Sequence, residues 1–408
     1  MAKIGLLGHG VVGGGVAEIL LKNAKLLQER VGQGLELTAI CDLRDFSALP
    51  YADLFTKDAQ ALLTRPDIDI VVECMGGVEP ARSFVLWAIE AGKHVVTSNK
   101  ALVVAAGEEI IQKASERGVR FLYEASTGGG IPVIGPLRQN LAANRIDRIA
   151  GILNGTTNYI LTRMRDGGAS FAAALKEAQQ KGYAEKDPSA DVEGDDARRK
   201  ICILCHVAFG SPLSDEKMFT EGITKLEKQD MLYAKELGRS VKLIALGERV
   251  ADGFRASVAP AMLPGDHPLA GVSDVFNAVL VNGDMVGDVL FYGRGAGQLP
   301  TASAIVGDLI DIVLHPADRA LASAQAPACL DALSGRMRLF SRVLRPLTPG
   351  AQQEVEGLFP GARLVTVEGE AFAGEFALIS EEGVESELRA RFARFDLPHG
   401  AIIRYISP

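Results

Sequence analysis

Short apolar runs alternate with stretches of helical periodicity throughout residues 1–125. The apolar runs have the length and the bounding turn residues that are typical of buried strands. They place the expected strands at Lys3–Gly8, Glu36–Asp42, Ile68–Cys74, His94–Ser98 and Arg120–Glu124. The expected helices between them are Val16–Arg30, Pro80–Ala91 and Gly107–Arg117. Because strands and helices alternate, we predict an α/β fold built on a parallel, doubly wound sheet.

The hydrophobic pattern changes after the glycine-rich turn Thr127–Pro132. Gly135–Ala208 is expected to be mainly helical around one strand near Arg148–Leu153, and Lys242–Tyr292 has the pattern of successive strands. A helix at Ala302–Leu314 closes this region. The mixture of helices and strands predicts an α+β domain.

A stretch of small residues with proline and glycine, Leu321–Gly335, has the composition of a linker. The pattern beyond it runs strand, helix, strand, strand, helix, strand. That order predicts a ferredoxin-like βαββαβ module. We therefore expect three domains, covering residues 1–126, 127–320 and 336–408.

The composition narrows the class of protein. The chain has 408 residues, of which 48% are hydrophobic, so it can bury two or three sizeable cores. Its formal charge of −8 argues against nucleic acid or an anionic membrane as a standing partner. We find no signal-peptide pattern and no apolar run near the roughly 20 residues that span a bilayer. With five cysteines placed mostly in apolar segments, as reduced thiols are, we expect a soluble cytoplasmic protein.

The first strand leads directly into a glycine-rich turn and a helix. Gly8, Gly10 and Gly13 have the spacing G-x-G-x-x-G in the segment GLLGHGVVGGGV. In such a turn one glycine tightens the bend, one lets a pyrophosphate approach, and one lets helix and strand pack closely. This context favours a Rossmann-type dinucleotide-binding domain over a purely structural turn.

The end of the second strand bears on the choice of cofactor. An acid there, Asp42, would bind a ribose 2′-hydroxyl and favour NAD. Arg44 lies two residues on and would instead accept the 2′-phosphate of NADP. A plain surface ion pair between the two is the third interpretation.

Two lysines are candidates for the chemistry. Lys100 follows the fourth strand, at the sheet edge where open α/β folds bind ligands, although a solvated loop lysine would look the same. Lys200 ends the charged stretch GYAEKDPSADVEGDDARRK, four residues after Asp196. On a helix these two side chains share a face, and a buried lysine among carboxylates can bind a zwitterion and move a proton. A helix terminus with surface ion pairs is the alternative.

Taken together, these features resemble the homoserine dehydrogenase family from Lys3 to about His315. The resemblance rests on nine ordered motifs: GHGVVGGGV, VVECMGGVEPA, GKHVVTSNKAL, EASTGGGIPVI, GILNGTTNYIL, GYAEKDPSADVEGDDARRK, DHPLAGV, FNAV and YGRGAGQLPTASA. The C-terminal module is similar to an ACT domain. The family interconverts L-homoserine and L-aspartate 4-semialdehyde with NAD or NADP, on the route to threonine and methionine.

The resemblance implies a role for each matching position. Lys200 matches the proton donor and acceptor, and Lys100 a lysine between cofactor and substrate. The substrate-binding positions are Glu185, Asp196, Asp191, Tyr183, Gly155 and Thr156. The cofactor-binding positions are Gly8, Gly10, Val11, Val12, Gly13, Asp42, Arg44, Gly76, Ser98, Lys100 and Gly295. A monovalent cation, Na⁺ or K⁺, would bind main-chain oxygens of Glu124, Thr127, Gly129 and Ile131. The family also implies a homodimer or homotetramer, and the ACT-like tail implies an amino-acid effector such as L-threonine or dimerisation alone.

Two other functions remain open at the level of sequence. One is a related amino-acid or semialdehyde dehydrogenase; an acylating one needs a reactive thiolate, and neither Cys74 nor Cys329 has a suitable setting. The other is a catalytically silent amino-acid sensor that uses the ACT-like tail. Cys41, where many relatives have a basic residue, leaves the NADP clamp to Arg44 or Lys57.

Overall fold

The computed structural model describes residues 1–317 and 327–407, which form two compact units. The first unit comprises Met1–Asn144, Cys202–Asp215 and Gly293–Pro327, and the second comprises Arg145–Ile201, Glu216–Tyr292 and Ala328–Pro408. Both units are therefore assembled from non-consecutive segments. The predicted domain boundary at residue 320 and the first part of the predicted linker Leu321–Gly335 lie outside the described residues.

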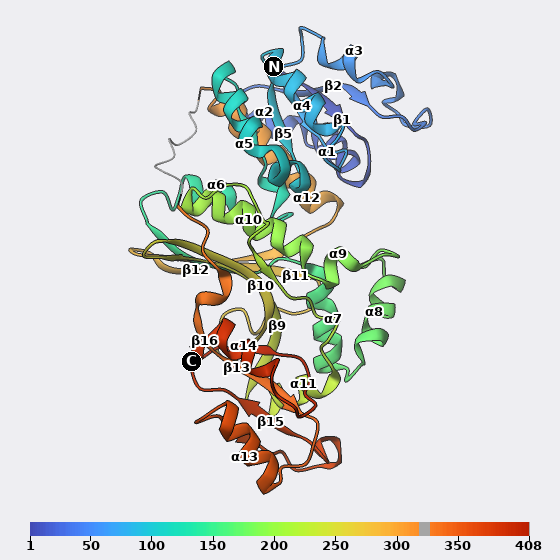
Figure 1. Ribbon diagram of the computed structural model, residues 1–408. Helices are drawn as coiled ribbons and strands as arrows, with labels where there is room; N and C mark the ends of the chain where they lie inside the picture. Colours follow the sequence, from blue (N-terminus) through green and yellow to red (C-terminus); the bar gives the residue numbers. More distant parts are fainter. Residues whose placement is uncertain (318–326, 408) are drawn as a thin grey trace. The chain divides into compact units, whose positions relative to one another are not determined.

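The first unit contains the predicted parallel sheet (Figure 1). Its strand order is β3-β2-β1-β4-β5-β6, and each neighbouring pair is parallel. This is the doubly wound order of dinucleotide-binding folds. The strands are β1 (Ala2–Leu7), β2 (Leu35–Cys41), β3 (Phe55–Thr56), β4 (Ile70–Glu73), β5 (His94–Thr97) and β6 (Phe121–Leu122). The short strand β3 was not predicted, because two residues give no readable periodicity.

The helices of this unit depart from the predicted bounds in several places. They are α1 (Val11–Lys22), α2 (Ala24–Val31), α3 (Ala59–Leu63), α4 (Ala81–Glu90), α5 (Lys100–Arg117), α6 (Ile134–Arg138) and α12 (Gln298–Leu314). Helix α3 was not predicted, and α12 begins at Gln298 rather than at Ala302. The predicted single helix Val16–Arg30 is divided at Asn23 into α1 and α2. The helix that was expected to begin at Gly107 begins at Lys100, where the Asn99 side chain accepts a hydrogen bond from Leu102 N and caps it.

Helix α12 packs against α1, although almost 300 residues separate their starts (Figure 1). Ala302 and Ile305 of α12 share one buried cluster with Val16 and Leu20 of α1. The close approach requires Gly15, because a Cβ at that position would lie 2.8 Å from the Gln298 carbonyl oxygen. Burial of this apolar face therefore holds α12 beside the glycine-rich turn.

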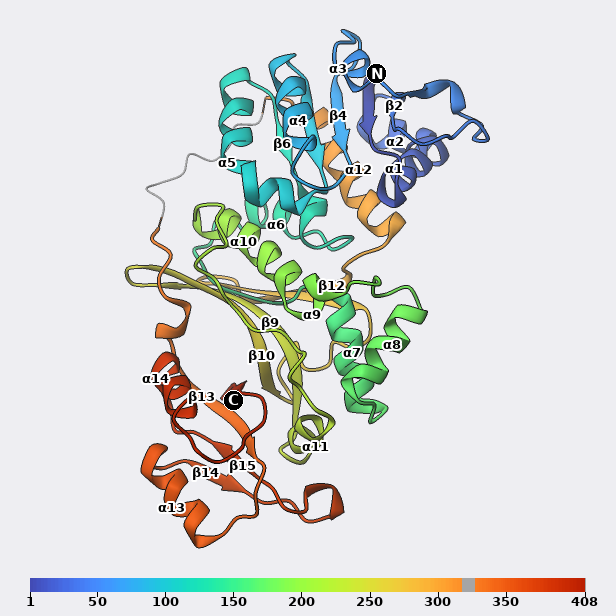
Figure 2. The same ribbon diagram turned by 45° about the vertical axis from the view of Figure 1, so that its right-hand side comes forward.

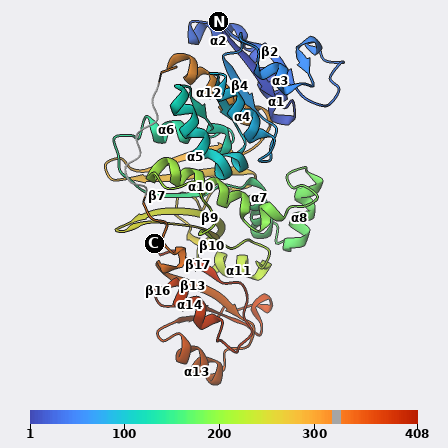
Figure 3. The same ribbon diagram turned by 45° about the horizontal axis from the view of Figure 1, so that its top comes forward.

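The second unit is built on a long mixed sheet of order β12-β11-β7-β9-β10-β17-β13-β15-β14. Its first part consists of β7 (Ile146–Ile152), β9 (Arg239–Val250), β10 (Gly253–Pro264), β11 (Phe276–Gly283) and β12 (Gly287–Arg294), with β8 (Phe219–Thr220) beside β10. The helices are α7 (Gly155–Asp166), α8 (Phe171–Gln180), α9 (Ser189–Val192), α11 (Lys228–Glu236) and the start of α10 (Asp195–Phe209). Helices α7 and α8 lie side by side (Figures 1 and 3).

The C-terminal segment has the predicted βαββαβ order with one added short strand, β16 (Gly383–Val384). The elements are β13 (Arg336–Val343), α13 (Pro349–Leu358), β14 (Arg363–Val365), β15 (Phe376–Ile379), α14 (Glu385–Phe392) and β17 (Ile403–Tyr405). Helices α13 and α14 can be followed in Figure 2. Both contribute to one buried cluster, in which Val355 of α13 and Phe392 of α14 lie with Leu339 of β13. This arrangement, with strand order 4-1-3-2, is the ferredoxin-like one.

The C-terminal strands do not form a separate sheet. Strand β17 pairs in parallel with β10, so that Ala261 lies opposite Arg404. A buried arginine adds a second link: Arg342 of β13 donates to Asp230 Oδ1 at 2.7 Å and to Glu375 Oε2 at 2.8 Å, and it also contacts Glu227. Asp230 and Glu227 belong to the start of α11. The C-terminal segment is therefore joined to the rest of the second unit by the pairing of β17 with β10 and by the ion pairs of Arg342. No helix within residues 1–317 and 327–407 is long and apolar enough to cross a bilayer.

Candidate active site

The glycine-rich turn of the first unit leaves the N-terminus of α1 open. Gly8 has a φ of +90°, which favours glycine, and its N–H donates to the Cys41 carbonyl at 2.8 Å. A Cβ on Gly13 would lie 2.0 Å from the Gly8 carbonyl oxygen, so turn and helix meet too closely for any side chain. The helix cap, Gly10, has no side chain, and the first turn carries no acid. These features fit a pyrophosphate held by the N–H groups of Gly10, Val11 and Val12.

Asp42 lies beside this turn, and its carboxylate is already occupied. His9 N donates to it at 2.7 Å, and Arg44 donates from its backbone N and from two side-chain nitrogens at 2.8–3.0 Å. The hydrogen bonds from Arg44 hold the pKa of Asp42 far below its usual range. The Arg44 guanidinium also passes 3.8 Å from the position of a Cβ on Gly10. Arg44 is therefore the exposed cation at the cofactor turn, and Asp42 orients it.

The carboxyl ends of β4 and β5 form the next part of the site. Glu73 is fully buried at the end of β4, where it accepts hydrogen bonds from Thr97 Oγ1 at 2.5 Å and from Met75 N at 2.7 Å. Burial raises the pKa of Glu73. Asn99 Nδ2 donates to the Gly77 carbonyl at 2.6 Å and so ties the two loops together.

Three predicted cofactor residues belong to these two loops. Gly76 has a φ of +82°, which favours glycine. Ser98 follows β5 and is partly exposed. Lys100 is the first residue of α5 rather than a free loop residue, which fixes its position at the sheet edge.

Lys200 of the second unit is buried in a small polar cluster. Its Nζ lies 2.8 Å from Asp196 Oδ2 and donates to the Leu153 carbonyl at 2.7 Å. Lys200 is 8% exposed and Asp196 7% exposed, so the pair is not the surface ion pair of the alternative interpretation. The predicted i,i+4 relationship on one face of α10 is confirmed. One turn of helix thus holds a lysine amine and a carboxylate together away from bulk water.

Asn154 organises the acids around this pair and is not among the site residues predicted from the sequence. Its Nδ2 donates to Asp191 Oδ1 at 2.7 Å and to Asp196 Oδ2 at 2.9 Å. Its Oδ1 accepts from Thr157 N and caps α7. Burial raises the pKa of Asp191, and the neighbouring charge of Asp196 raises it further. An asparagine directly after a strand and before a helix was the available signal, since such a residue is a strong cap.

The remaining predicted substrate residues lie around the start of α7 and the segment after α8. Thr156 Oγ1 donates to the Tyr183 carbonyl at 2.6 Å. Gly155 has no room for a side chain, because a Cβ would lie 2.9 Å from the Val275 carbonyl oxygen. Glu185 is exposed, and its main-chain carbonyl accepts a hydrogen bond from Gln179 Nε2 at 3.1 Å. The structure therefore brings together Lys200, Asp196 and Asp191 through Asn154, and leaves the Glu185 carboxylate outside that hydrogen-bonded set.

The turn that was predicted to bind a monovalent cation follows β6 in the first unit. The carbonyl oxygens of Thr127, Gly129 and Ile131 accept no hydrogen bond from any described residue. A Cβ on Gly128 would lie 2.3 Å from the Ile131 oxygen, and one on Gly129 would lie 2.3 Å from the Gly295 oxygen. Glycines at positions 128 and 129 are therefore required for the main chain of this turn to pack so closely against the Ile131 and Gly295 carbonyls. Uncommitted carbonyl oxygens are the ligands that hard cations prefer.

Each unit thus has its own functional part. The first has a doubly wound sheet with an open glycine turn, and the second has a buried lysine–carboxylate pair fit for proton transfer. Together these define a dinucleotide-dependent oxidoreductase.

Comparison with known proteins identifies the family to which this oxidoreductase belongs. The model of the homoserine dehydrogenase NAD-binding domain matches residues 8–124, and the homoserine dehydrogenase model matches residues 132–310. The homoserine dehydrogenase of Neisseria gonorrhoeae is 49% identical over 313 residues, which are 76% of this chain and 72% of that protein. The chain belongs to the homoserine dehydrogenase family, and it is an NAD(P)-dependent oxidoreductase.

Solved structures agree with this assignment. The crystal structure of a homoserine dehydrogenase from Thiobacillus denitrificans matches with a TM-score of 0.91 and 38% identity, covering 100% of this chain and 98% of that one. A hyperthermophilic archaeal homoserine dehydrogenase in complex with NADPH matches with a TM-score of 0.66 and 29% identity, over 77% of this chain and 98% of that one. The first match includes the C-terminal strands and helices.

Proposed function

We propose that Lys200 is the acid and base in the interconversion of L-homoserine and L-aspartate 4-semialdehyde. The observation that carries this role is the buried Lys200–Asp196 pair, in which the Lys200 amine also donates to the Leu153 carbonyl. Bound NAD(P) supplies the acceptor for the hydride of the substrate alcohol. In that direction the Lys200 amine takes the hydroxyl proton, and in the reverse direction its ammonium returns a proton to the developing alkoxide.

The acids around Lys200 suit the other end of the substrate. Asp191 and Glu185 carry carboxylates that can accept hydrogen bonds from the α-ammonium group of homoserine. Thr156, Gly155 and Tyr183 complete this part of the proposed site, and Asp196 keeps the Lys200 amine in place. For Lys100 we propose a position between cofactor and substrate, where its charge stabilises the oxygen at which negative charge develops.

For the cofactor we propose a preference for NADP, with Arg44 on the 2′-phosphate. The support is that Asp42, the residue that would accept a ribose 2′-hydroxyl, has its oxygens occupied by His9 N and Arg44. Arg44 itself keeps most of its side chain exposed at the same turn. The archaeal relative described above was solved with NADPH.

Replacing Arg44 by alanine is expected to raise the KM for NADP about 10- to 100-fold and to change the KM for NAD less than threefold. A charge-assisted hydrogen bond of about 1.5–3 kcal/mol is lost only with the phosphorylated cofactor. Steady-state kinetics with both cofactors measures this. Lys25→Ala, at an exposed lysine of α2, is the matched control, and equal KM changes for NADP and NAD in R44A would contradict the assignment.

We also propose that a monovalent cation, Na⁺ or K⁺, binds the main-chain oxygens of Glu124, Thr127, Gly129 and Ile131. Exchange into a buffer whose only cation is tetramethylammonium is expected to lower kcat severalfold, and added KCl or NaCl to restore it. Choline chloride at equal ionic strength is the control. An activity that is the same in all four buffers would show that the carbonyls hold no cation needed for turnover.

The assembly and the C-terminal segment are proposed from the family resemblance. We propose a dinucleotide-binding part at residues 1–126, a substrate part at 127–320 and an ACT-like part at 336–408, in a homodimer or homotetramer. The edge strand β12 and its turn support association, because Met285, Leu290 and Tyr292 expose large apolar side chains. A solution mass equal to one chain would contradict it. An amino-acid effector such as L-threonine is the proposed ligand of the ACT-like part.

A further inference from the structure

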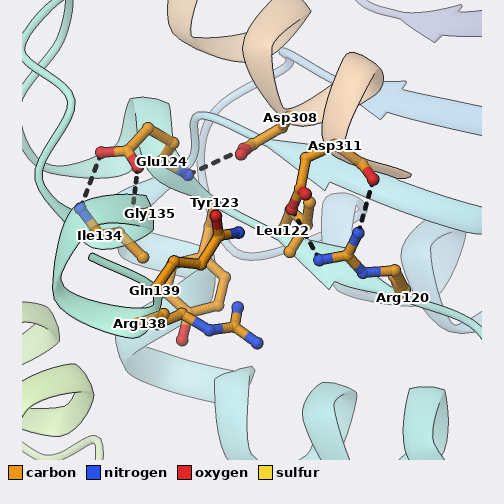
Figure 4. Close-up of a pocket in the computed structure, with 10 residues that line it drawn as sticks. All are labelled: Arg120, Leu122, Tyr123, Glu124, Ile134, Gly135, Arg138, Gln139, Asp308 and Asp311. Carbon is orange, nitrogen blue, oxygen red and sulfur yellow. Dashed lines mark hydrogen bonds and ion pairs between the residues drawn. The ribbon is translucent and has the colours of Figure 1, made fainter. Parts of the chain in front are cut away.

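The first unit contains a cavity of about 140 Å³ that none of the proposed steps uses (Figure 4). It lies among β6, the helical turn Glu124–Ser126, α6 and α12. The residues that line it are Arg120, Leu122, Tyr123, Glu124, Ile134, Gly135, Arg138, Gln139, Asp308 and Asp311. Its volume suits a molecule of a few heavy atoms rather than a nucleotide.

Several charged groups in the wall already have partners. Both oxygens of Glu124 accept backbone hydrogen bonds, from Val133 and Ile134 at 2.7 and 2.9 Å and from Gly135 at 2.6 Å. Arg120 forms an ion pair with Asp311 at 2.7 Å. These groups form part of the cavity wall, and the hydrogen bonds named here run to other protein atoms rather than into the cavity.

Two other groups have polar atoms without a partner. Tyr123 is 5% exposed, yet its hydroxyl makes no hydrogen bond with residues 1–317 or 327–407. The guanidinium of Arg138, at the end of α6, likewise has no ion pair or hydrogen bond in the described chain. Figure 4 shows Tyr123, Arg138 and Gln139 gathered together, with the Arg120–Asp311 pair on the opposite side. The Tyr123 hydroxyl and the Arg138 guanidinium line the same cavity, and neither has a hydrogen-bond partner among the described residues, so a bound anion would complete the arrangement.

We propose that this cavity binds a small carboxylate, held by the Arg138 guanidinium and the Tyr123 hydroxyl. The planar arginine fork matches a carboxylate with two parallel hydrogen bonds, and the hydroxyl can donate a third. Leu122, Ile134 and the Tyr123 ring form an apolar wall that suits the carbon skeleton of an organic acid. One unpaired cation close to the Asp308 carboxyl favours a monoanion over inorganic phosphate.

The Asp308 carboxyl also determines which carboxylates fit best. One of its oxygens accepts a hydrogen bond from Glu124 N at 2.9 Å, and the group lines the same cavity. An ammonium group on the ligand would find an acceptor there, whereas a plain carboxylic acid would not. The site would thus distinguish α-amino acids from simple monocarboxylates.

Ligand-observed NMR with ¹³C-labelled acetate and glycine tests the proposal on the full-length chain. We expect saturable binding of at least one of them, weakened about 10-fold or more in Arg138→Met and severalfold in Tyr123→Phe. Arg117→Met removes an exposed arginine at the end of α5 and is expected to leave binding unchanged. All titrations use one fixed Na⁺ concentration, because Glu124 is also a proposed cation ligand. Circular dichroism confirms that each variant is folded.

The relative affinities identify the kind of carboxylate. Tighter binding of glycine than of acetate, with the difference abolished in Asp308→Asn, would support an α-amino-acid site, and equal binding would support a monocarboxylate site. Equal affinities for wild type and R138M would overturn the proposal. So would binding of inorganic phosphate that is tighter than both carboxylates and depends on Arg138.

Discussion

Replacing Lys200 by methionine is expected to lower kcat for L-homoserine oxidation by about 10³-fold and to leave NADP binding unchanged. Methionine keeps most of the volume of the side chain and removes the group that takes the proton. Positioned general acid–base groups contribute typically about 10²- to 10⁴-fold. The contacts of Lys200 are with Asp196 and the Leu153 carbonyl of its own unit, and the proposed cofactor turn is built from other residues. We therefore expect cofactor affinity to stay the same when turnover is lost.

Steady-state kinetics gives kcat, and fluorescence titration with NADPH gives cofactor affinity. Lys176→Met is the matched control, since Lys176 is an exposed lysine of α8 in the same unit. A K200M variant that is folded and retains more than about a tenth of the wild-type kcat would exclude Lys200 as the acid and base.

Replacing Arg342 by methionine is expected to lower the free energy of unfolding by about 3–5 kcal/mol. The Arg342 side chain is 2% exposed and Asp230 is 0% exposed, so the change leaves a carboxylate buried without its cation. Breaking a buried ion pair in this way costs about that much, whereas removing both partners often costs little. The double variant Arg342→Met with Asp230→Asn is therefore expected to regain part of the loss.

Urea unfolding followed by circular dichroism measures these differences. Arg336→Met is the control on the same strand, because the Arg336–Glu382 pair is mostly exposed and should contribute less than about 1 kcal/mol. If R342M and R336M unfold at the same urea concentration, the buried cluster does not stabilise the junction between β13 and α11.

Local chemistry made part of this site predictable from sequence. The glycines of the first turn could be identified because backbone contact and positive φ exclude side chains there, as Gly8 and Gly13 show. The Lys200–Asp196 pair followed from helical periodicity, which places residues four apart on one face. In each case the cause lies within a few residues, so the sequence carries the information.

Contacts between distant segments were not predictable in this way. Asn154 meets Asp191 and Asp196 only because the end of β7 lies beside α9 and α10. Helix α12 was placed with the middle segment, and only burial against α1 shows that it covers the nucleotide-binding sheet. The pairing of β17 with β10 was not predicted, because the periodicity of a strand does not show which other strand it pairs with.

The most direct test of the central claim is the absorbance of reduced nicotinamide after L-homoserine is added to the purified chain. NADP and NAD are run in parallel in a potassium buffer, with K200M beside the wild type. We expect reduction of both cofactors by the wild type, faster with NADP, and almost none by K200M. No reduction of either cofactor by protein shown to be folded would contradict it.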